Sequence, residues 1–188
     1  MPFEHVHIIA KIDQASTVIS SLKAQAETIA AICSTVRVCL RNGGQVLTCG
    51  NGGSAAEAMH LSEELIGRFR GDREPYAALC LNADPTALTC IANDYGFEQV
   101  FARQVRALAQ EGDVLVAFST SGNSPNILRA MREARARKAA VIGLLGKGGG
   151  AAAELCDLVL VVNSDETEHI QEAHQVLLHL MLEAVERS

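Results

Sequence analysis

Tryptophan is absent from this chain of 188 residues, and aromatic residues of all kinds make up only 4% of it. Ring clusters therefore cannot fill the interior, although apolar residues reach 48%, which is ample for a core. Glycine, by contrast, is frequent, with 15 residues. We expect one ordered domain, residues 1–188, in which helices and strands pack closely through small and aliphatic side chains around tight turns.

Positive charge is also scarce. The chain has 16 Lys and Arg against 22 Asp and Glu, a net charge of −6, and it contains no basic run of the kind that grips phosphate backbones. Nucleic acid is therefore not expected as a partner. No uninterrupted apolar run approaches the roughly 20 residues that span a bilayer, so no membrane partner is expected either. A small anionic ligand is still compatible with this charge, because backbone amides can bind phosphate.

The sequence also lacks a signal-peptide pattern and paired cysteines, and both absences bear on the cellular compartment of the protein. The start of the chain, MPFEHVHIIAKIDQAS, carries charged residues and histidines too early for a signal peptide. No CxxC pair occurs, and most cysteines stand beside Val, Leu, Ile or Ala, which favours buried free thiols over disulfides. Both observations predict a cytoplasmic protein. The six cysteines are Cys33, Cys39, Cys49, Cys80, Cys90 and Cys156.

The N-terminal region is predicted to be helical. Apolar residues recur at helical spacing through residues 4–41, and RNGG at 41–44 is typical of a helix C-cap and turn. We expect one long helix or two helices there. This arm, residues 1–42, has no partner of its own before the first strand, so we expect it to pack against the main domain or against another subunit in an oligomer.

Residues 43–188 alternate between predicted strands and helices. The strands are continuously apolar, as in parallel sheets that are buried on both faces. Repeated strand–helix units with short connections predict an α/β fold, a doubly wound three-layer sandwich with a five-stranded parallel sheet. The expected strands are 45–50, 76–81, 113–119, 139–145 and 157–162, and the expected helices are about 54–69, 84–93, 97–109, 124–137, 150–155 and 167–187.

Two loops at the carboxyl ends of strands carry the strongest chemical signal. CGNGGSAAEAMH (49–60) is rich in glycine, and STSGNSPN (119–126) is rich in hydroxyls; each leads from a strand into a helix. Small residues, hydroxyls and free amides at a helix start suit an anion. Either loop alone could be a tight turn with an N-cap, but the two together favour phosphate. Neither is a P-loop or a GxGxxG dinucleotide motif, which favours a small phosphorylated metabolite over a nucleotide.

The helix after the first loop carries His60 and Glu64, four residues apart and therefore on one face. Such a pair can chelate a divalent metal or serve as acid and base. It is also common as a solvated surface pair. Glu63 is expected to point about 100° away around the helix.

The C-terminal helix contains HIQEAHQVLLHLML, an apolar stretch with three histidines and two glutamines. Gln171, Gln175 and His179 form an i, i+4, i+8 row, and His174 lies to one side. His179 could be a satisfied core residue, or a ligand or proton shuttle if it faces His60 and Glu64. Gln171 and His179 lie about 12 Å apart along the axis, so a shared metal would require strain or ligands from two chains.

Six stretches together resemble the sugar isomerase (SIS) domain family, most closely its bacterial phosphoheptose isomerases. They are GNGGSAAEAMH, EELIGRF, ANDYGFEQVFARQV, GDVLVAFSTSGNSPNIL, VIGLLGKGGG and HIQEAHQVLLHLMLEAVE. The resemblance runs from about Gly43 to Glu186; the first 42 residues match only in helical character. It implies a flavodoxin-like SIS fold and a homotetramer with sites at subunit interfaces.

The resemblance implies an aldose–ketose isomerase that converts D-sedoheptulose 7-phosphate, a phosphorylated seven-carbon sugar, to D-glycero-D-manno-heptose 7-phosphate through an enediol. This would be the first step toward the heptoses of lipopolysaccharide or other surface glycans. Glu64 would be the catalytic base and His179 the partner acid/base. Zinc, one ion per subunit, would be held by His60, Glu64, Gln171 and His179. Substrate would be bound by Asn51, Gly52, Gly53, Ser54, Arg68, Asn93, Asp94, Ser119, Thr120, Ser121, Ser124 and Gln171, with the hydroxyl groups of this set on the phosphate.

Two departures and three alternatives accompany the resemblance. Gly148 stands where an Asp is usual, and Glu168 stands at a variable position. Some relatives are non-catalytic regulatory proteins that bind the replication initiator, but they lack the equivalents of His60 and His179, which this chain keeps. A sugar-phosphate sensor would need a DNA-binding extension that is missing here. An isomerase for a different phosphorylated ketose is the nearest enzymatic alternative.

Overall fold

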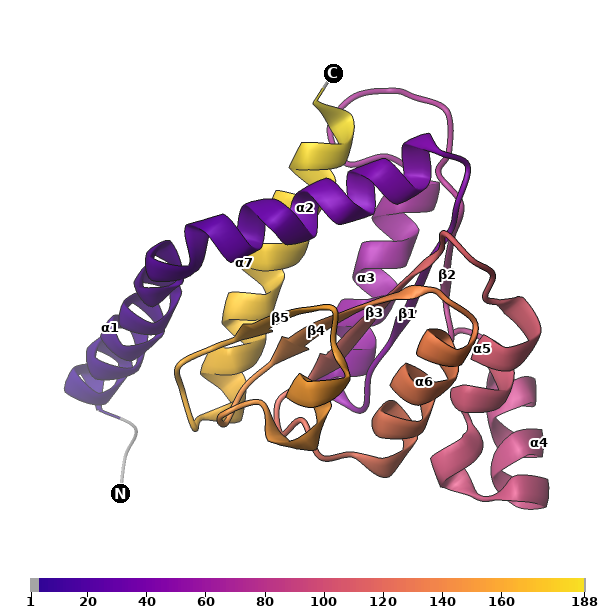
Figure 1. Ribbon diagram of the computed structural model, residues 1–188. Coiled ribbons are helices and arrows are strands. Elements are labelled where there is room, and N and C mark those ends of the chain that lie inside the picture. Colours follow the sequence, from indigo (N-terminus) through magenta and orange to yellow (C-terminus); the bar gives the residue numbers. More distant parts are fainter. Residues whose placement is uncertain (1–3, 188) are drawn as a thin grey trace.

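The computed structural model describes residues 4–187 and contains a five-stranded, fully parallel sheet in the order β2-β1-β3-β4-β5 (Figure 1). The predicted α/β class and the strand count are confirmed. The order reverses its direction at β1 and β3, so the crevice between their carboxyl ends is a topological switch point, where ligands bind in such folds. The strands are β1 (Val46–Cys49), β2 (Ala78–Cys80), β3 (Val114–Ser119), β4 (Ala140–Leu145) and β5 (Leu158–Val161).

Helices cover both faces of the sheet. Alternate side chains of β3 enter different cores: Val116 and Phe118 pack with α2, α3 and α7, whereas Leu115 packs with α5 and α6. Both faces are therefore apolar, which explains the uninterrupted hydrophobic strands. The helices are α1 (His5–Ser21), α2 (Ala26–Arg41), α3 (Gly53–Ile66), α4 (Pro85–Tyr95), α5 (Ala102–Leu108), α6 (Pro125–Ala136) and α7 (Thr167–Glu186), with 3₁₀ turns at Leu22–Gln25, Phe97–Gln99 and Gly150–Leu155.

Most element boundaries fall within a few residues of expectation. The N-terminal region forms two helices, α1 and α2, joined by a 3₁₀ turn. The helix expected to run to residue 69 ends at Ile66, because the chain turns at Gly67, whose backbone is non-helical. The segment expected to be helical over 97–109 begins as a 3₁₀ turn and becomes α-helical only at Ala102.

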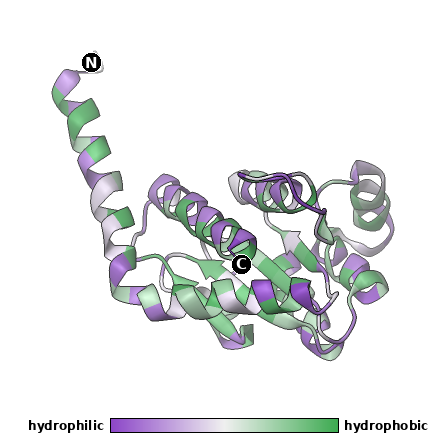
Figure 2. Cartoon of the chain, turned by 90° about the horizontal axis from the view of Figure 1, so that it is seen from above, coloured by the Kyte–Doolittle hydropathy of each residue, from purple (hydrophilic) through white to green (hydrophobic). Residues whose placement is uncertain are grey.

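The first helix stands apart from the body of the molecule (Figure 2). None of its residues is buried, and the side chains of Val6, Ile9 and Ile12 are 74%, 52% and 60% exposed. Its contacts are to α7, including an exposed ion pair between Lys11 and Glu168 at 3.5 Å. This apolar surface is what the prediction of an oligomer-packing arm requires, and the assembly stays a prediction.

All six cysteines lie within the described residues and are free thiols, as expected. Cys33, Cys39, Cys49 and Cys80 are buried, and burial raises the pKa of the Cys33 thiol to about 11. The prediction of burial is wrong for Cys90, which is exposed, and holds only in part for Cys156, which is half-buried. Between residues 4 and 187, none of the helices combines the length and the apolar character needed to cross a membrane.

Candidate active site

Two loops predicted to bind phosphate meet around one cavity of about 200 Å³ beyond β1 and β3. Segments about seventy residues apart in sequence are joined there because their strands are neighbours in the sheet. Their roles as substrate ligands stay predictions, but most of the predicted residues share this cavity, which we call the hydroxyl pocket. It is lined by Asn51, Gly53, Ser54, Phe118, Ser119, Thr120, Ser121, Ser124, Thr167 and Gln171.

Side-chain amides hold the two loops of the hydroxyl pocket together. Asn51 and Asn126 exchange reciprocal hydrogen bonds of 2.9 and 2.8 Å. The Oγ of Ser119 accepts the N–H of Gly122 at 3.1 Å, which shapes the second loop. Ser124 occupies the N-cap position of α6 but makes no capping bond with its side chain. Both α3 and α6 begin at this pocket, so their first-turn N–H groups and dipoles favour an anion there.

Two glycines of the first loop, Gly52 and Gly53, are required for different structural reasons. Gly52 precedes α3 with φ of +58°, a conformation that L side chains rarely adopt. Gly53 has no side chain because a Cβ there would lie 2.3 Å from Nε2 of Gln171. The absence of that Cβ lets the Gln171 amide enter the hydroxyl pocket from α7.

A second cluster lies farther along the same two helices, at His60, Glu64 and His179; we call it the imidazole–carboxylate cluster. His60 Nε2 is 3.5 Å from Glu64 Oε1, and the rings of His60 and His179 are 5.3 Å apart at 81°. His60 and Glu64 from α3 thus meet His179 from α7. His179 is therefore not an isolated core histidine. Convergence within a single chain could not be read from the sequence, because it depends on how α3 packs against α7.

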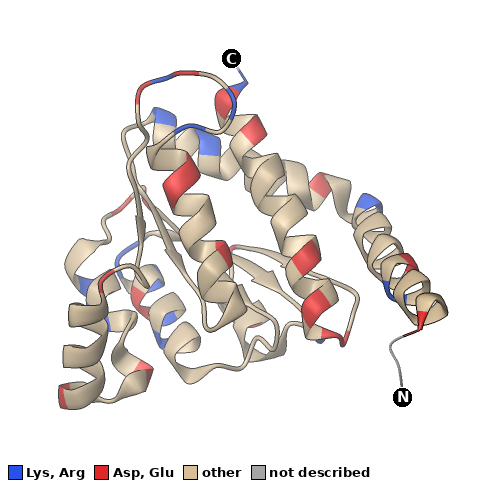
Figure 3. Cartoon of the chain, turned by 180° about the vertical axis from the view of Figure 1, so that it is seen from behind, with Lys and Arg blue, Asp and Glu red and all other residues tan. Residues whose placement is uncertain are grey.

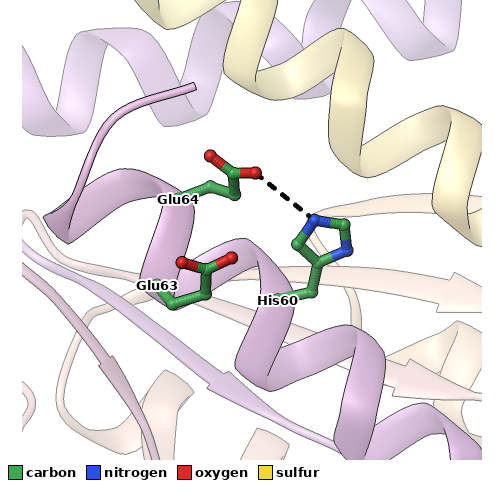
Figure 4. Close-up of side chains that lie close together, drawn as sticks. All are labelled: His60, Glu63 and Glu64. Atoms are coloured by element: carbon green, nitrogen blue, oxygen red, sulfur yellow. Dashed lines mark ion pairs between the residues drawn. The ribbon is translucent and has the colours of Figure 1, made fainter. Parts of the chain in front are cut away.

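Glu63 also reaches this cluster. One ligand atom each of His60, Glu63 and Glu64 lies within 4.8 Å of the others (Figure 4). The expectation that Glu63 points away is wrong for its carboxylate, because the side chain is long enough to reach back across the 100° step around the helix. The available signal in the sequence is HLSEE, which places Glu63 directly beside Glu64 and three residues after His60.

Gln175 orients His60. Its Oε1 lies 3.0 Å from His60 Nδ1, so the Nδ1–H donates to the amide oxygen in this arrangement. The Nε2 lone pair of His60 then faces the Glu64 carboxylate at 3.5 Å. Two acceptors facing each other repel unless a proton or a cation lies between them, and fixing a histidine through its other nitrogen is typical of metal ligands.

His179 is held between two rings. The Phe69 ring lies nearly parallel to it, with centroids 5.6 Å apart and planes at 17°, and His60 approaches it edge-on. Burial lowers the pKa of His179, the nearby His60 lowers it further, and the Glu64 carboxylate opposes both. His179 is therefore neutral at neutral pH and able to accept a proton.

The four predicted metal ligands are not all in one place in the single chain. His60, Glu64 and His179 converge, whereas Gln171 lies in the hydroxyl pocket, about 12 Å before His179 along α7. This separation is the one anticipated from their spacing. Imidazole nitrogens and a carboxylate are suitable zinc ligands. His60 and Glu64 present such atoms within 4.8 Å of each other, together with Glu63, whereas His179 and Gln171 stay predicted ligands.

Four predicted substrate ligands do not line the hydroxyl pocket: Gly52, which belongs to the first loop, and three residues that lie elsewhere. Arg68 is exposed in the loop after α3, and Asn93 and Asp94 are exposed in the last turn of α4. Apolar residues of α4 pack into the core on the α5–α6 face of the sheet, opposite α3 and α7. None of these three lines the hydroxyl pocket, so their assignment to substrate stays a prediction.

The two remaining histidines of α7 are buried and face inward. His174 Nδ1 lies 3.5 Å from the buried carboxylate of Glu57, and its ring packs edge-on against Phe118. His169 Nδ1 lies 2.8 Å from Glu172 on its own helix. Neither touches the imidazole–carboxylate cluster, so of the three histidines only His179 faces it.

The two helices that carry the imidazole–carboxylate cluster, α3 and α7, contain acidic residues and no Lys or Arg. The sequence GSAAEAMHLSEELI of α3 and the sequence TEHIQEAHQVLLHLMLEAVE of α7 make this explicit, and Figure 3 shows red positions along both. The local charge therefore favours a bound cation, and an anion in the hydroxyl pocket depends on N–H and O–H donors.

Comparison with known proteins identifies the relatives of the chain. The family model described as the SIS domain matches residues 12–146. A phosphoheptose isomerase of Campylobacter concisus is 53% identical over 156 residues, covering 83% of this chain and 82% of the relative. One from Bordetella avium is 50% identical over 169 residues, covering 88% and 86%. The structure of phosphoheptose isomerase GmhA from Neisseria gonorrhoeae superposes with a TM-score of 0.90 at 39% identity, covering 95% and 96%.

Proposed function

The chain belongs to the SIS domain family and, within it, to the phosphoheptose isomerases, and from that premise we propose that it interconverts D-sedoheptulose 7-phosphate and D-glycero-D-manno-heptose 7-phosphate. The proposed place of action is the cytoplasm, at the first step toward the heptoses of lipopolysaccharide or other surface glycans.

One observation carries the proposal: the hydroxyl pocket and the imidazole–carboxylate cluster lie at successive levels of the same two helices. Gln171 packs on Gly53 at the first level, and His179 faces His60 at the second. A linear sugar with phosphate at one end and its reacting carbons at the other matches this order. A phosphate held far from the reacting carbons anchors the substrate for the chemical step.

The reaction needs one group for carbon-bound protons and one for oxygen-bound protons. Glu64 removes a proton from C1 of the ketose while His179 manages the proton on the C2 oxygen, which gives the enediol. Return of a proton to C2, with loss of the hydroxyl proton on C1, gives the aldose. His179 donates a ring N–H proton to the C2 oxygen in the first step and accepts the C1 hydroxyl proton in the second, so both Glu64 and His179 return to their starting states.

Phosphate binding in this proposal depends on hydroxyl groups and on helix N-termini. Ser54 lies in the first turn of α3, and Ser124 stands at the N-cap of α6, where its side chain makes no capping bond. Thr120 and Ser121 line the same pocket. Because no Lys or Arg lines the pocket, the first-turn amides supply the favourable field.

Zinc, one ion per subunit, is part of the proposal. His60, Glu64 and His179 would hold it, with Gln171 as the predicted fourth ligand. The facing lone pairs of His60 and Glu64 and the acidic character of α3 and α7 support a cation there. When bound, such an ion supplies charge that stabilises the oxygens of the enediolate.

A homotetramer with sites at subunit interfaces completes the proposal. The exposed apolar side chains of α1 need a cover, which a second copy can supply. Arg68, Asn93 and Asp94 lie away from the hydroxyl pocket of their own chain. They act on substrate only if a neighbouring subunit's pocket receives them.

The test is a coupled assay with sedoheptulose 7-phosphate, run with and without a chelator. Turnover of the phosphorylated sugar, with little or none of free sedoheptulose, is the expected result. Loss of turnover after chelation and recovery with added zinc support the metal assignment. A folded protein that turns over no sugar phosphate in either condition contradicts the proposal and favours a non-catalytic regulatory member of the family.

A further inference from the structure

The loop between α3 and β2, residues 67–77, is fastened to both helices of the active site by one ion pair. Arg73 Nε lies 3.2 Å from Glu186 Oε1, and the two side chains are only 14% and 15% exposed. The Arg73 guanidinium also stacks on the Tyr76 ring, 4.6 Å from its centroid. Nothing in the proposed reaction uses this pair, although it is more buried than most ion pairs of the described chain.

Arg73 caps the carboxyl end of α3. Its Nη2 donates to the carbonyl oxygen of Glu64 at 2.6 Å, and its Nη1 donates to that of Leu65 at 2.9 Å. These are carbonyls of the last helical turn, which lack partners within the helix. A cation also interacts favourably with the dipole at this end. Arg73 therefore holds the backbone from which the Glu64 carboxylate projects.

Glu186 ends α7 and holds the start of the same loop. Its carboxylate accepts the backbone N–H groups of Phe69 at 3.1 Å and of Arg70 at 3.2 Å. Burial by itself raises the pKa of Glu186, but the hydrogen bonds from Phe69, Arg70, Arg73 and Gly71 together outweigh it and hold the pKa below its usual value. The backbone of Phe69 is thus fixed relative to α7.

Phe69 in turn lies flat against His179, with ring centroids 5.6 Å apart. His60 approaches the same imidazole edge-on, so the ring orientation of His179 depends on Phe69. Because an error of about 1 Å in a catalytic group can cost on the order of 100-fold in rate, the loop that places Phe69 affects chemistry without touching substrate.

We propose that Arg73 and Glu186 are positioning residues of the isomerase: Arg73 holds Glu64 through its carbonyl, and Glu186 holds His179 through Phe69. This inference rests on the proposed function for its kinetic consequences. Its structural consequence, the orientation of the His179 ring, is independent of any activity.

The kinetic test compares Glu186→Gln and Arg73→Met with Phe69→Leu, which leaves the ion pair intact. Each is expected to lower kcat by about 10- to 100-fold, with KM for the sugar phosphate changed by less than about threefold because the hydroxyl pocket is untouched. Adding Glu186→Gln to Phe69→Leu should lower kcat little further, since both act through the same ring.

Glu133→Gln is the matched control. It removes a carboxylate that is 16% exposed, about as buried as that of Glu186, and that pairs at 2.9 Å with the more exposed Arg106 between α5 and α6 on the other face of the sheet. Its kcat is expected to equal that of the unmodified protein. A second readout uses metal-free protein with ¹³C-labelled histidine at about pH 8, above the ordinary histidine pKa of about 6.5. The His179 resonance, assigned with His179→Gln, should lose its ring-current shift in Phe69→Leu and move in the same direction in Glu186→Gln, but not in Glu133→Gln.

Three results would overturn the inference: unchanged kcat in both Glu186→Gln and Arg73→Met, rate losses that multiply with that of Phe69→Leu, or a His179 resonance that stays in place in Glu186→Gln. An unmodified protein without isomerase activity would instead refute the proposed function, and the resonance would still decide whether Glu186 positions His179.

Discussion

The hydroxyl pocket and the imidazole–carboxylate cluster share two helices but are built in opposite ways. The pocket consists of short side chains and loop backbone at the starts of α3 and α6. The cluster consists of long side chains in the later turns of α3 and α7, with His60 and Glu64 facing His179 across the helix interface. The pocket is therefore fixed mainly by local backbone geometry, whereas the cluster depends on how two helices and one loop pack.

This difference predicts separable kinetics. Substitutions in the pocket should weaken substrate binding with little effect on the chemical step, and substitutions in the cluster should do the reverse. A substitution that changes kcat and KM together would mean that the two regions act as one unit.

The largest effect is expected from Glu64→Gln, with His179→Gln close behind. Removal of a general base or acid costs about 10²- to 10⁴-fold in kcat, so turnover should be nearly abolished. The fold, and with it the proposed tetramer, should persist, because neither side chain belongs to a main hydrophobic core. The coupled assay measures the rate and size-exclusion chromatography measures the assembly. A rate like that of the unmodified protein in either variant would refute the assigned role.

An intermediate effect is expected from Thr120→Val in the hydroxyl pocket. The substitution keeps the shape of the side chain and removes one hydroxyl near the proposed phosphate. A hydrogen bond to a charged group is worth about 1.5–3 kcal/mol, so KM should rise by about 10- to 100-fold while kcat changes little. Thr89→Val is the control, because the Thr89 hydroxyl bonds only to carbonyls of its own exposed helix. A fall in kcat with unchanged KM would remove the distinction between the two regions.

The smallest effect concerns the acid stability of the loop beside the cluster. The pKa of Glu186 lies below its usual value in the folded protein, so the unfolded chain binds a proton here before the folded one does. The stabilisation is complete above the ordinary Glu pKa of about 4.3 and is lost as pH falls through the folded value. Glu186→Gln should therefore be less stable than the unmodified protein at neutral pH, by no more than about 1 kcal/mol.

Urea unfolding at neutral pH and at about pH 3 measures this difference. The gap between Glu186→Gln and the unmodified protein should narrow in acid. A gap that stays constant with pH would mean that the carboxylate charge contributes nothing to stability at this site.

Much of the fold followed from pattern. Five uninterrupted apolar strands and the helices between them were enough to predict the parallel sheet, since burial on both faces requires apolar residues at every position. The loop at 119–126 was informative together with the loop at 49–60, because two such strand-to-helix loops in one sheet favour an anion more than either does alone. Boundaries were less determined: Gly67 ends α3 earlier than helical spacing suggested, because one backbone conformation can override propensity.

The candidate site was only partly readable. The i, i+4 spacing of His60 and Glu64 predicted their shared face. The distance between Gln171 and His179 predicted that a shared metal would require strain or ligands from two chains. Glu63 was missed because the flexibility of its side chain is not visible in a helical wheel. Arg73 and Glu186 were missed because 113 residues separate them in sequence, and no periodicity links a loop to the far end of another helix.

The sequence by itself determined the sheet, the helices and the two phosphate-type loops, because hydrophobic periodicity and turn chemistry act over a few residues. Only the tertiary structure decided that Gly53 makes room for Gln171, that His179 faces His60, and that Glu186 holds Phe69. Each of these contacts joins residues more than 100 positions apart. Their geometry is set by the packing of α7 beside α3 on one face of the sheet, a long-range property that local pattern does not encode.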